Sequence, residues 1–372
     1  MAKIFVLFTI ILCLTAGFLP LQSVRAADVG GHVVLSIYDR PSGKSNGVQS
    51  SNSVGFTLRR FFLYFSQEIS DKISVELEPE WSASTGATPR LGSPIAKKTN
   101  PGDVEAEFHG LVKAQVTMLL PKDFELSFGI VKPLFSWDYG RELFWGEEFN
   151  GGKWSCNTAL GAVHDAGFEL YKTFEFGDVS LPAYFYLLNG ASEYGDNNKM
   201  PAIMATVEPD FGALKLKSSV YTGTWNDAYD EEGVWGKYGA DDKALKFFKY
   251  LFGVSFEKGP FSIRSEYAAS NWSGKLADNQ DAKQMGFYVK AFYRFSSWAR
   301  FMLHYDYVDY NYSGSALGDE KYVTISPTLQ IYPDESTGLF IVYDIADWKR
   351  DRSGVKDTAK FNRLTTGLRV TF

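Results

Sequence analysis

The chain ends on the stretch Arg363-Leu364-Thr365-Thr366-Gly367-Leu368-Arg369-Val370-Thr371-Phe372. Leu364, Leu368 and Val370 fall on one side of a two-residue period and the two arginines fall on the other, which is the period of a β-strand. The apolar side continues to Phe372, although chain ends usually fray unless something holds them. A strand in a membrane needs a partner on both edges, so we predict that residues 363–372 close a transmembrane barrel against its first strand.

The first 26 residues have the features of a secretory signal peptide. Lys3 precedes an apolar run at residues 4–14, a break at Gly17 and Pro20 follows, and residues 24–26 form a candidate cleavage site. A single membrane-anchoring helix is the alternative, but no other apolar run long enough to span a membrane as a helix follows. We therefore predict a signal peptide at residues 1–26 and an exported barrel at residues 27–372.

The composition suits an exported barrel. Removing residues 1–26 removes Lys3 and Arg25 and no acid, so the formal charge changes from −6 to −8, and an acidic exported protein is not expected to bind nucleic acid. Cys156 is then the only cysteine, which excludes an intramolecular disulfide and metal sites built from several thiolates. Aromatic residues make up 16% of the chain, as rings at two membrane interfaces would require.

Sixteen segments alternate apolar with polar residues. Residues 73–81 are the clearest, because Ile73 and Val75 alternate with Glu76, Glu78 and a third carboxylate, and such a row cannot face lipid. The segments are 32–38, 56–66, 73–81, 105–116, 124–131, 163–172, 179–189, 200–208, 214–225, 247–257, 261–270, 284–295, 298–312, 321–332, 337–348 and 360–372.

The connections between these segments alternate between short and long. Turns such as 120–123 and 258–260 are short, whereas every other connection is longer, up to 133–161. Outer-membrane barrels have short periplasmic turns and long extracellular loops, and an even strand number leaves both termini on the periplasmic side. We therefore predict an all-β fold, a transmembrane antiparallel β-barrel of about sixteen strands. A soluble β-sandwich is the alternative, but it has no reason to sort its loops by side.

Several short motifs resemble the phosphate-selective porin O and P family. They are Arg59-Arg60-Phe61-Phe62-Leu63-Tyr64-Phe65, Phe128-Gly129-Ile130-Val131-Lys132-Pro133-Leu134-Phe135, and Leu188-Asn189-Gly190 followed by Asp196-Asn197-Asn198. The aromatic C-terminus adds to the resemblance, which is scattered over most of the mature chain. It implies a trimeric sixteen-stranded barrel with basic residues lining a path for anions such as phosphate. The chain departs from that pattern in having several acidic rows among those expected to face inward.

The residues expected to line the pore form an acidic and a basic group. Strands up to about residue 172 contribute mostly acids and strands from 247 onward mostly bases, so the charges are expected to be segregated around the circumference. Because the last strand is expected to begin near residue 360, Arg363 is placed at its outer end. The bases are Arg60, Lys113, Lys249, Arg264, Lys290, Arg294, Arg300, Arg363 and Arg369. The acids are Glu76, Glu78, Glu80, Glu105, Glu107, Asp165 and Glu169, with Glu125, Glu257, Glu266, Asp306 and Asp344 as further inward acids.

The third long connection, residues 133–161, has the composition of a constriction loop. A sixteen-strand barrel encloses a channel too wide to select small solutes by its wall alone. Aromatic residues such as Phe135 and Trp137 would pack the loop against the wall, and its acids, opposite the arginines, would create a transverse field that orients polar solutes. A loop lying over the outer mouth is the alternative. The charged constriction residues are Asp138, Arg141, Glu142, Glu147 and Glu148.

Other kinds of site have less support. His109, His164 and His304 lie on separate predicted strands without metal-ligand spacing, so we predict neither a metal site nor a cofactor. Neither a nucleophile elbow nor a matched Ser/His/acid trio is legible, so no enzyme activity is predicted. Acids within residues 227–242 have the chemistry to bind a divalent cation that bridges lipopolysaccharide, although a solvated acidic loop is the simpler explanation.

These patterns predict a diffusion porin of a Gram-negative outer membrane that passes small hydrophilic solutes and ions. The expected partners are outer-membrane lipid, lipopolysaccharide and the barrel-assembly machinery, which would engage the strand ending at Phe372. A homotrimer is implied by the family resemblance. The alternative from another class is a structural barrel, either adhesin-like or a sheath around a partner such as an electron-transfer protein.

Overall fold

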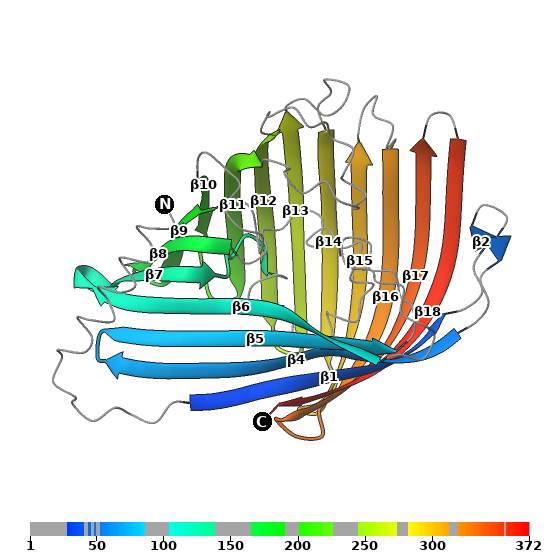
Figure 1. The fold of residues 1–372 in the computed structure, drawn as a ribbon, viewed down its shortest axis with the longest axis horizontal. Coiled ribbons are helices and arrows are strands. Elements are labelled where there is room, and N and C mark those ends of the chain that lie inside the picture. The colour runs from blue at the N-terminus through cyan, green and yellow to red at the C-terminus, as the bar shows by residue number, and fades with distance from the viewer. Residues whose placement is uncertain are drawn as a thin grey trace.

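The computed structural model describes residues 28–40, 44–45, 48–49, 53–85, 104–137, 165–189, 201–225, 245–273, 282–311, 319–352 and 355–371. Within these ranges sixteen antiparallel strands form a closed barrel, and two short strands form a separate hairpin (Figure 1). The described part of the chain has one helical segment, the 3-10 turn η1 (Pro121–Asp123). It contains no helix long and apolar enough to cross a membrane.

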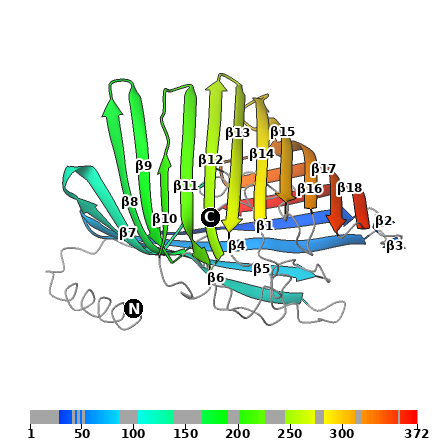
Figure 2. The ribbon, with the colours of Figure 1, turned by 90° about the horizontal axis from the view of Figure 1, so that it is seen from above.

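Each barrel strand pairs with the strands before and after it along the chain, and β1 pairs with both β4 and β18, which closes the ring (Figure 2). The barrel strands are β1 (Asp28–Arg40), β4 (Ser53–Ser70), β5 (Ile73–Thr85), β6 (Val104–Leu120), β7 (Phe124–Val131), β8 (Asp165–Phe176), β9 (Val179–Leu188), β10 (Ala202–Val207), β11 (Leu214–Trp225), β12 (Leu245–Lys258), β13 (Phe261–Ser273), β14 (Ala282–Arg294), β15 (Ala299–Asn311), β16 (Asp319–Ile331), β17 (Thr337–Arg352) and β18 (Val355–Thr371). The hairpin strands are β2 (Lys44–Ser45) and β3 (Val48–Gln49), in the first long connection.

The C-terminal stretch closes the barrel, as its pattern predicted. On one edge of β18, Val370 lies opposite Val33 of β1, and on the other edge it lies opposite Thr337 of β17. Both rows of backbone hydrogen-bonding groups are therefore paired, as a strand in a membrane requires. The predicted fold class and strand number are confirmed. Phe372 lies outside the described residues.

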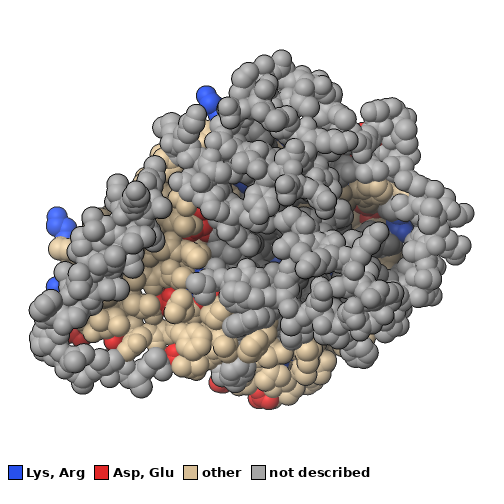
Figure 3. All heavy atoms as spheres, viewed as in Figure 1, with Lys and Arg blue, Asp and Glu red and all other residues tan. Residues whose placement is uncertain are grey.

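Alternation along the strands separates an apolar outer face from an inner face. On β12, Phe248, Phe252 and Val254 are 45%, 58% and 43% exposed, whereas Lys249 and Leu251 between them are buried. A barrel surrounded by lipid needs this arrangement, because apolar side chains must cover its outside. Uncharged atoms cover most of the described surface in the view of Figure 3, with acidic and basic atoms in small groups.

Large exposed aromatic side chains gather where the strands meet the short turns. Tyr293, Phe295 and Trp298 lie around the turn between β14 and β15, Phe261 begins β13, and Phe176 ends β8. Rings prefer the boundary between lipid headgroups and acyl chains, because they combine an apolar body with a polar or polarisable edge. These residues therefore mark the level of one membrane interface, on the periplasmic side of the barrel.

Several strand ends differ from the sequence expectation. β18 begins at Val355 rather than near residue 360, so Arg363 lies near the middle of a strand of 17 residues and not at its outer end. β14 ends at Arg294 and β15 begins at Ala299, so Phe295 and Trp298 belong to the turn. Polar residues on both faces obscure the two-residue period beyond the membrane, which is why the pattern misses such ends.

The short turns contain backbone conformations that favour glycine. Gly177, Gly212 and Gly259 have φ values of 62°, 81° and 61°, and nothing lies within 4 Å of the position a Cβ would take at any of them. Lys122 and Asp123 adopt φ values of 64° and 57° despite carrying side chains. Such a left-handed conformation costs a residue with a Cβ roughly 1–2 kcal/mol.

We predict opposite effects for two turn substitutions. Gly177→Ala should destabilise the barrel by about 1 kcal/mol through backbone strain alone, since the added methyl group meets no neighbour. Lys122→Gly should stabilise it by a similar amount, because it removes strain that is already present. The measurement is the temperature at which the SDS-resistant folded band converts to the unfolded band. Equal conversion temperatures for wild type and both variants would contradict the assignment of strain to these turns.

Candidate functional site

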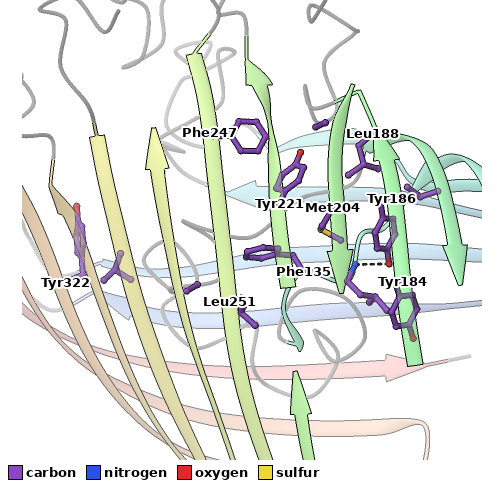
Figure 4. Packing of buried hydrophobic residues seen from close by; sticks show 14 residues of the cluster. Phe135, Tyr184, Tyr186, Leu188, Met204, Tyr221, Phe247, Leu251 and Tyr322 are labelled. Carbon is purple, nitrogen blue, oxygen red and sulfur yellow. Dashed lines mark hydrogen bonds between the residues drawn. The ribbon is translucent and has the colours of Figure 1, made fainter. Parts of the chain in front are cut away.

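The third long connection begins by running along the inside of the barrel. Its first residues, 132–137, follow β7 and are called the root segment here. Leu134, Phe135 and Ser136 are buried, and the ring of Phe135 lies 6.4 Å from that of Tyr221, on the inner face of β11. Figure 4 shows Phe135 among inner-face side chains that include Tyr186 and Tyr221. The root segment therefore packs against the inner wall.

Side chains from three neighbouring strands satisfy the backbone of the root segment. The Leu134 amide donates to the hydroxyl of Tyr186 on β9 at 3.2 Å (dashed in Figure 4), and the hydroxyl of Thr206 on β10 donates to the Leu134 carbonyl at 3.3 Å. The hydroxyl of Ser219 on β11 donates to the Phe135 carbonyl at 2.8 Å. A buried backbone outside a strand ladder needs such partners. These hydroxyl groups thus make the inner wall a suitable surface for the segment.

Glu266 on β13 accepts three hydrogen bonds at the far end of the root segment. Its Oε2 accepts from the Ser136 hydroxyl at 2.5 Å and from the Tyr288 hydroxyl at 2.8 Å, and its Oε1 accepts from the Trp137 amide at 2.9 Å. Glu266 is 1% exposed, so these donors replace the water that a carboxylate would otherwise keep. The segment is therefore fixed from β9 to β13, across five strands of the inner wall.

The Trp137 ring fits against Gly253 of β12. A Cβ on Gly253 would lie 2.8 Å from Cζ3 of Trp137 and 3.1 Å from Cγ of Glu266, so only glycine leaves room for this contact. Lys217 Nζ and Arg264 Cζ each lie 5.7 Å from the ring centroid, within cation–π range. The ring thus covers two cations of the wall.

A polar network covers the inner face of β5 and β6, away from the root segment's far end. Lys113 forms an ion pair with Glu76, and Gln115 Nε2 donates to the same carboxylate at 3.1 Å. Lys132, directly after β7, lies 3.9 Å from Glu78. These side chains are only partly exposed, and the predicted acids here are accompanied by two bases. The carboxylates are therefore partly neutralised by their neighbours.

Two further predicted acids lie on β8. Asp165 is the first residue of the strand and is buried opposite Val131 of β7, and Glu169 lies opposite Tyr186 of β9 on the inner face. The structure does not describe every predicted site residue. Arg60, Glu80, Glu105 and Glu107 lie in strands whose side chains are not described at these positions, and Asp138, Arg141, Glu142, Glu147 and Glu148 lie outside the described residues.

Three basic side chains line up across adjacent strands of the opposite wall. Lys290 of β14 lies directly opposite Arg264 of β13 and directly opposite His304 of β15. Lys249, on β12, is buried with its Nζ 5.6 Å and 5.7 Å from the rings of Phe247 and Tyr221. His304 packs its ring against Tyr288, so it is part of the wall and has no metal-ligand company among the described residues.

Arg363 is engaged by a buried carboxylate. Its Nε and Nη2 lie 3.0 Å and 2.6 Å from Oδ2 of Asp344, which faces it from β17 and also accepts from the Ser326 hydroxyl at 2.7 Å. Asp344 is 1% exposed. The sequence placed Arg363 high on the wall as a free cation of the pore; the structure corrects this, because the longer β18 brings it level with Asp344.

The remaining predicted bases lie lower on the wall, toward the short turns. Arg300 donates to Gln330 and stacks on Phe292 at 5.1 Å. Arg369 donates to the Thr371 hydroxyl at 3.1 Å and 2.8 Å. Arg294 is exposed at the end of β14, 4.0 Å from Glu257. That these residues line an open pore stays a prediction.

Sequence reasoning missed the residues that receive the root segment. Lys217 and Ser219 alternate with Leu216 and Val220, so the period could have placed them on the inner face of β11. Lys217 is buried and pairs with Glu208 at 2.7 Å. No local signal indicates that Gly253 faces an aromatic ring more than one hundred residues earlier in the chain. That contact depends on how the barrel closes.

Comparisons with known proteins support the fold. No family model and no curated protein matches the chain. The outer membrane channel DcaP of Acinetobacter baumannii is similar with a TM-score of 0.61 and 12% identity, over 93% of this chain and 97% of that one. OmpT, an outer membrane protein of Vibrio cholerae in trimer form, gives 0.58, 13%, 93% and 99% for the same quantities. An anion-selective porin from Comamonas acidovorans gives 0.58, 13%, 93% and 99%.

At these identities the likeness establishes the fold, which this chain shares with outer-membrane barrels that include porins. Membership of the phosphate-selective porin O and P family stays a prediction, because no family model matches.

We predict that Glu266→Gln loosens the root segment. An amide has one acceptor oxygen and one donor nitrogen, so the variant loses acceptors for donors that stay buried, at a cost of about 2 kcal/mol. Gly253→Val should have the same effect by displacing Trp137. The measurements are proteolytic cleavage within the third connection of the folded barrel and current noise in planar bilayers, both of which should increase.

The matched control is Glu257→Gln, a carboxylate at the exposed end of the neighbouring strand that pairs with Arg294. Equal cleavage and equal noise for Glu266→Gln and Glu257→Gln would show that the carboxylate of Glu266 does not fix the segment.

Proposed function

We propose that this protein is an outer-membrane porin, a water-filled channel for the diffusion of small hydrophilic solutes and ions. The observation that carries the proposal is the root segment, which turns into the barrel and crosses the inner wall from β9 to β13. An interior lined by Glu76, Lys113 and Lys290 is suited to water and ions rather than to a packed apolar core. The fold shared with an outer membrane channel and an anion-selective porin supports the same function.

The proposal includes a constriction formed by the third connection. Residues 138–161 continue from a root segment that is already inside the barrel, and a channel of this strand number needs such a narrowing to select among small solutes. The carboxylates of Glu142 and Glu147 would then face the basic residues of β12–β15 across the passage. This is the placement that a transverse field requires.

The proposed location is the outer membrane of a Gram-negative bacterium, reached with the signal peptide at residues 1–26. Lipid, lipopolysaccharide and, during insertion, the barrel-assembly machinery acting on the strand that ends at Phe372 are the proposed partners. The outer face of exposed apolar side chains and the aromatic residues at the short-turn level support it.

The central test of the channel proposal is conductance. Purified barrel added to a planar bilayer should produce stepwise increases in current, because an open lumen carries ions. A sheath filled by a partner would be silent until the partner is removed. Protein that inserts, shows the heat-dependent shift of a folded barrel in SDS and still passes no current would overturn the proposal.

The constriction has its own test. Glu142→Ala and Glu147→Ala together should shift the reversal potential toward anion selectivity, because they remove negative charge from the narrowest level. The paired control is Glu320→Ala, at the start of β16 near the outer-loop end of the barrel. An unchanged reversal potential in the Glu142 and Glu147 variant would reject the third connection as the constriction while leaving the channel proposal intact.

We also propose a homotrimer. The support is the family resemblance and the similarity to OmpT of Vibrio cholerae, whose structure is of a trimer form. Chemical crosslinking in native membranes should yield a band of three chains that dissociates on boiling. A purely monomeric pattern would contradict the trimer.

A further inference from the structure

The inner wall has an acidic side. On β5–β8, five carboxylates of the inner face are buried or half-buried, and the only bases of that kind among the described residues there are Lys113 and Lys132. The negative charges on this side therefore exceed the positive charges by three. The carboxylates are Glu76, Glu78, Glu125, Asp165 and Glu169.

The inner wall also has a basic side. On β12–β18, six described cations of the inner face are buried or half-buried, against three carboxylates, and His304 is counted as neutral. The positive charges on this side therefore exceed the negative charges by three. The cations are Lys249, Arg264, Lys290, Arg300, Arg363 and Arg369, and the carboxylates are Glu266, Asp306 and Asp344.

The strand order places these two sides opposite each other. In a closed ring of sixteen strands, a strand faces the one eight places away. By that count β5, with Glu76 and Glu78, faces β13, with Arg264. In the same way β6 faces Lys290 on β14, and β7 faces Arg300 on β15. Between the two sides, Lys217 and Glu208 form a neutral pair.

The excess charges of the two sides cancel in sum but not in direction. A single ion crossing the lumen gains near the side of opposite sign and loses near the other, so little selectivity for either sign follows. A solute that carries both signs at its two ends gains on both sides when it aligns across the lumen. The arrangement therefore discriminates between solutes by their dipole and not by their net charge.

We propose that the solutes favoured by this channel are small linear zwitterions, compounds with an ammonium group at one end and a carboxylate at the other. The inference rests on the proposed porin function and names its substrate class. The ammonium group would lie toward Glu76 and Glu78, and the carboxylate toward Arg264 and Lys290.

The first experiment compares permeation in liposomes that contain the purified barrel. The probes are 4-aminobutyrate, which is zwitterionic at neutral pH, and 4-hydroxybutanamide, a neutral compound of the same chain length. The zwitterion should enter about threefold faster, a small part of the effect that charged clefts have on association rates. Equal rates would overturn the substrate class and leave the porin intact, whereas no entry of either probe would overturn the porin itself.

The second experiment separates dipole from net charge. Glu76→Gln with Glu78→Gln should make the channel anion-selective, and Arg264→Gln with Lys290→Gln should make it cation-selective. Both double variants should lose the preference for the zwitterion. The fourfold variant should return to weak ion selectivity without regaining that preference. A fourfold variant that still prefers the zwitterion would overturn the proposal.

Two controls accompany these variants. Lys360→Gln removes an exposed cation from the outer face of β18 and should leave both the ion selectivity and the zwitterion preference unchanged. The heat-dependent shift in SDS establishes that each variant is folded. If the Arg264 and Lys290 variant does not fold, Lys249→Gln with Arg300→Gln removes the same excess charge from the same side, and a retained preference in it would equally overturn the proposal.

Discussion

Closure of the backbone hydrogen-bond ring is the constraint on which the rest of this structure depends. Each of the sixteen strands has both edges paired, and the pairing of β18 with β1 completes the circle. Once no edge is free, every strand has one face toward the surroundings and one toward the interior, and its two-residue period becomes a division between Phe248 or Phe252 outside and Lys249 or Leu251 inside. The apolar exterior and the charged interior are thus consequences of the same closure.

The root segment shows how a barrel interior can receive chain that is not part of its sheet. Burying backbone without a strand partner is costly, and here the cost is offset by hydroxyl groups of Tyr186, Thr206 and Ser219 and by the carboxylate of Glu266. Gly253 contributes by lacking a side chain, which leaves space for Trp137. Each of these residues would look unremarkable in its own strand. Their function appears only where the segment crosses them.

Pairing within the wall reduces the charge that a solute meets. Glu76 is accompanied by Lys113, and Asp344 by Arg363, so a list of inward charges overstates the field in the lumen. What survives the pairing is an excess of acid on β5–β8 and of base on β12–β18, eight places away around the ring. The weak overall selectivity proposed for ions and the stronger effect proposed for dipolar solutes both follow from this remainder.

The sequence by itself determined the number of strands, their faces and the sorting of short turns from long connections, because a period of two residues and a turn are local features that adjacent residues encode. It did not determine the outer end of β18, and so it placed Arg363 too high. It gave no sign that Trp137 and Glu266, 129 residues apart, would share a hydrogen bond. That contact was decided by the tertiary structure alone, since which inner faces lie under the root segment depends on the strand tilt and register set when the ring closes.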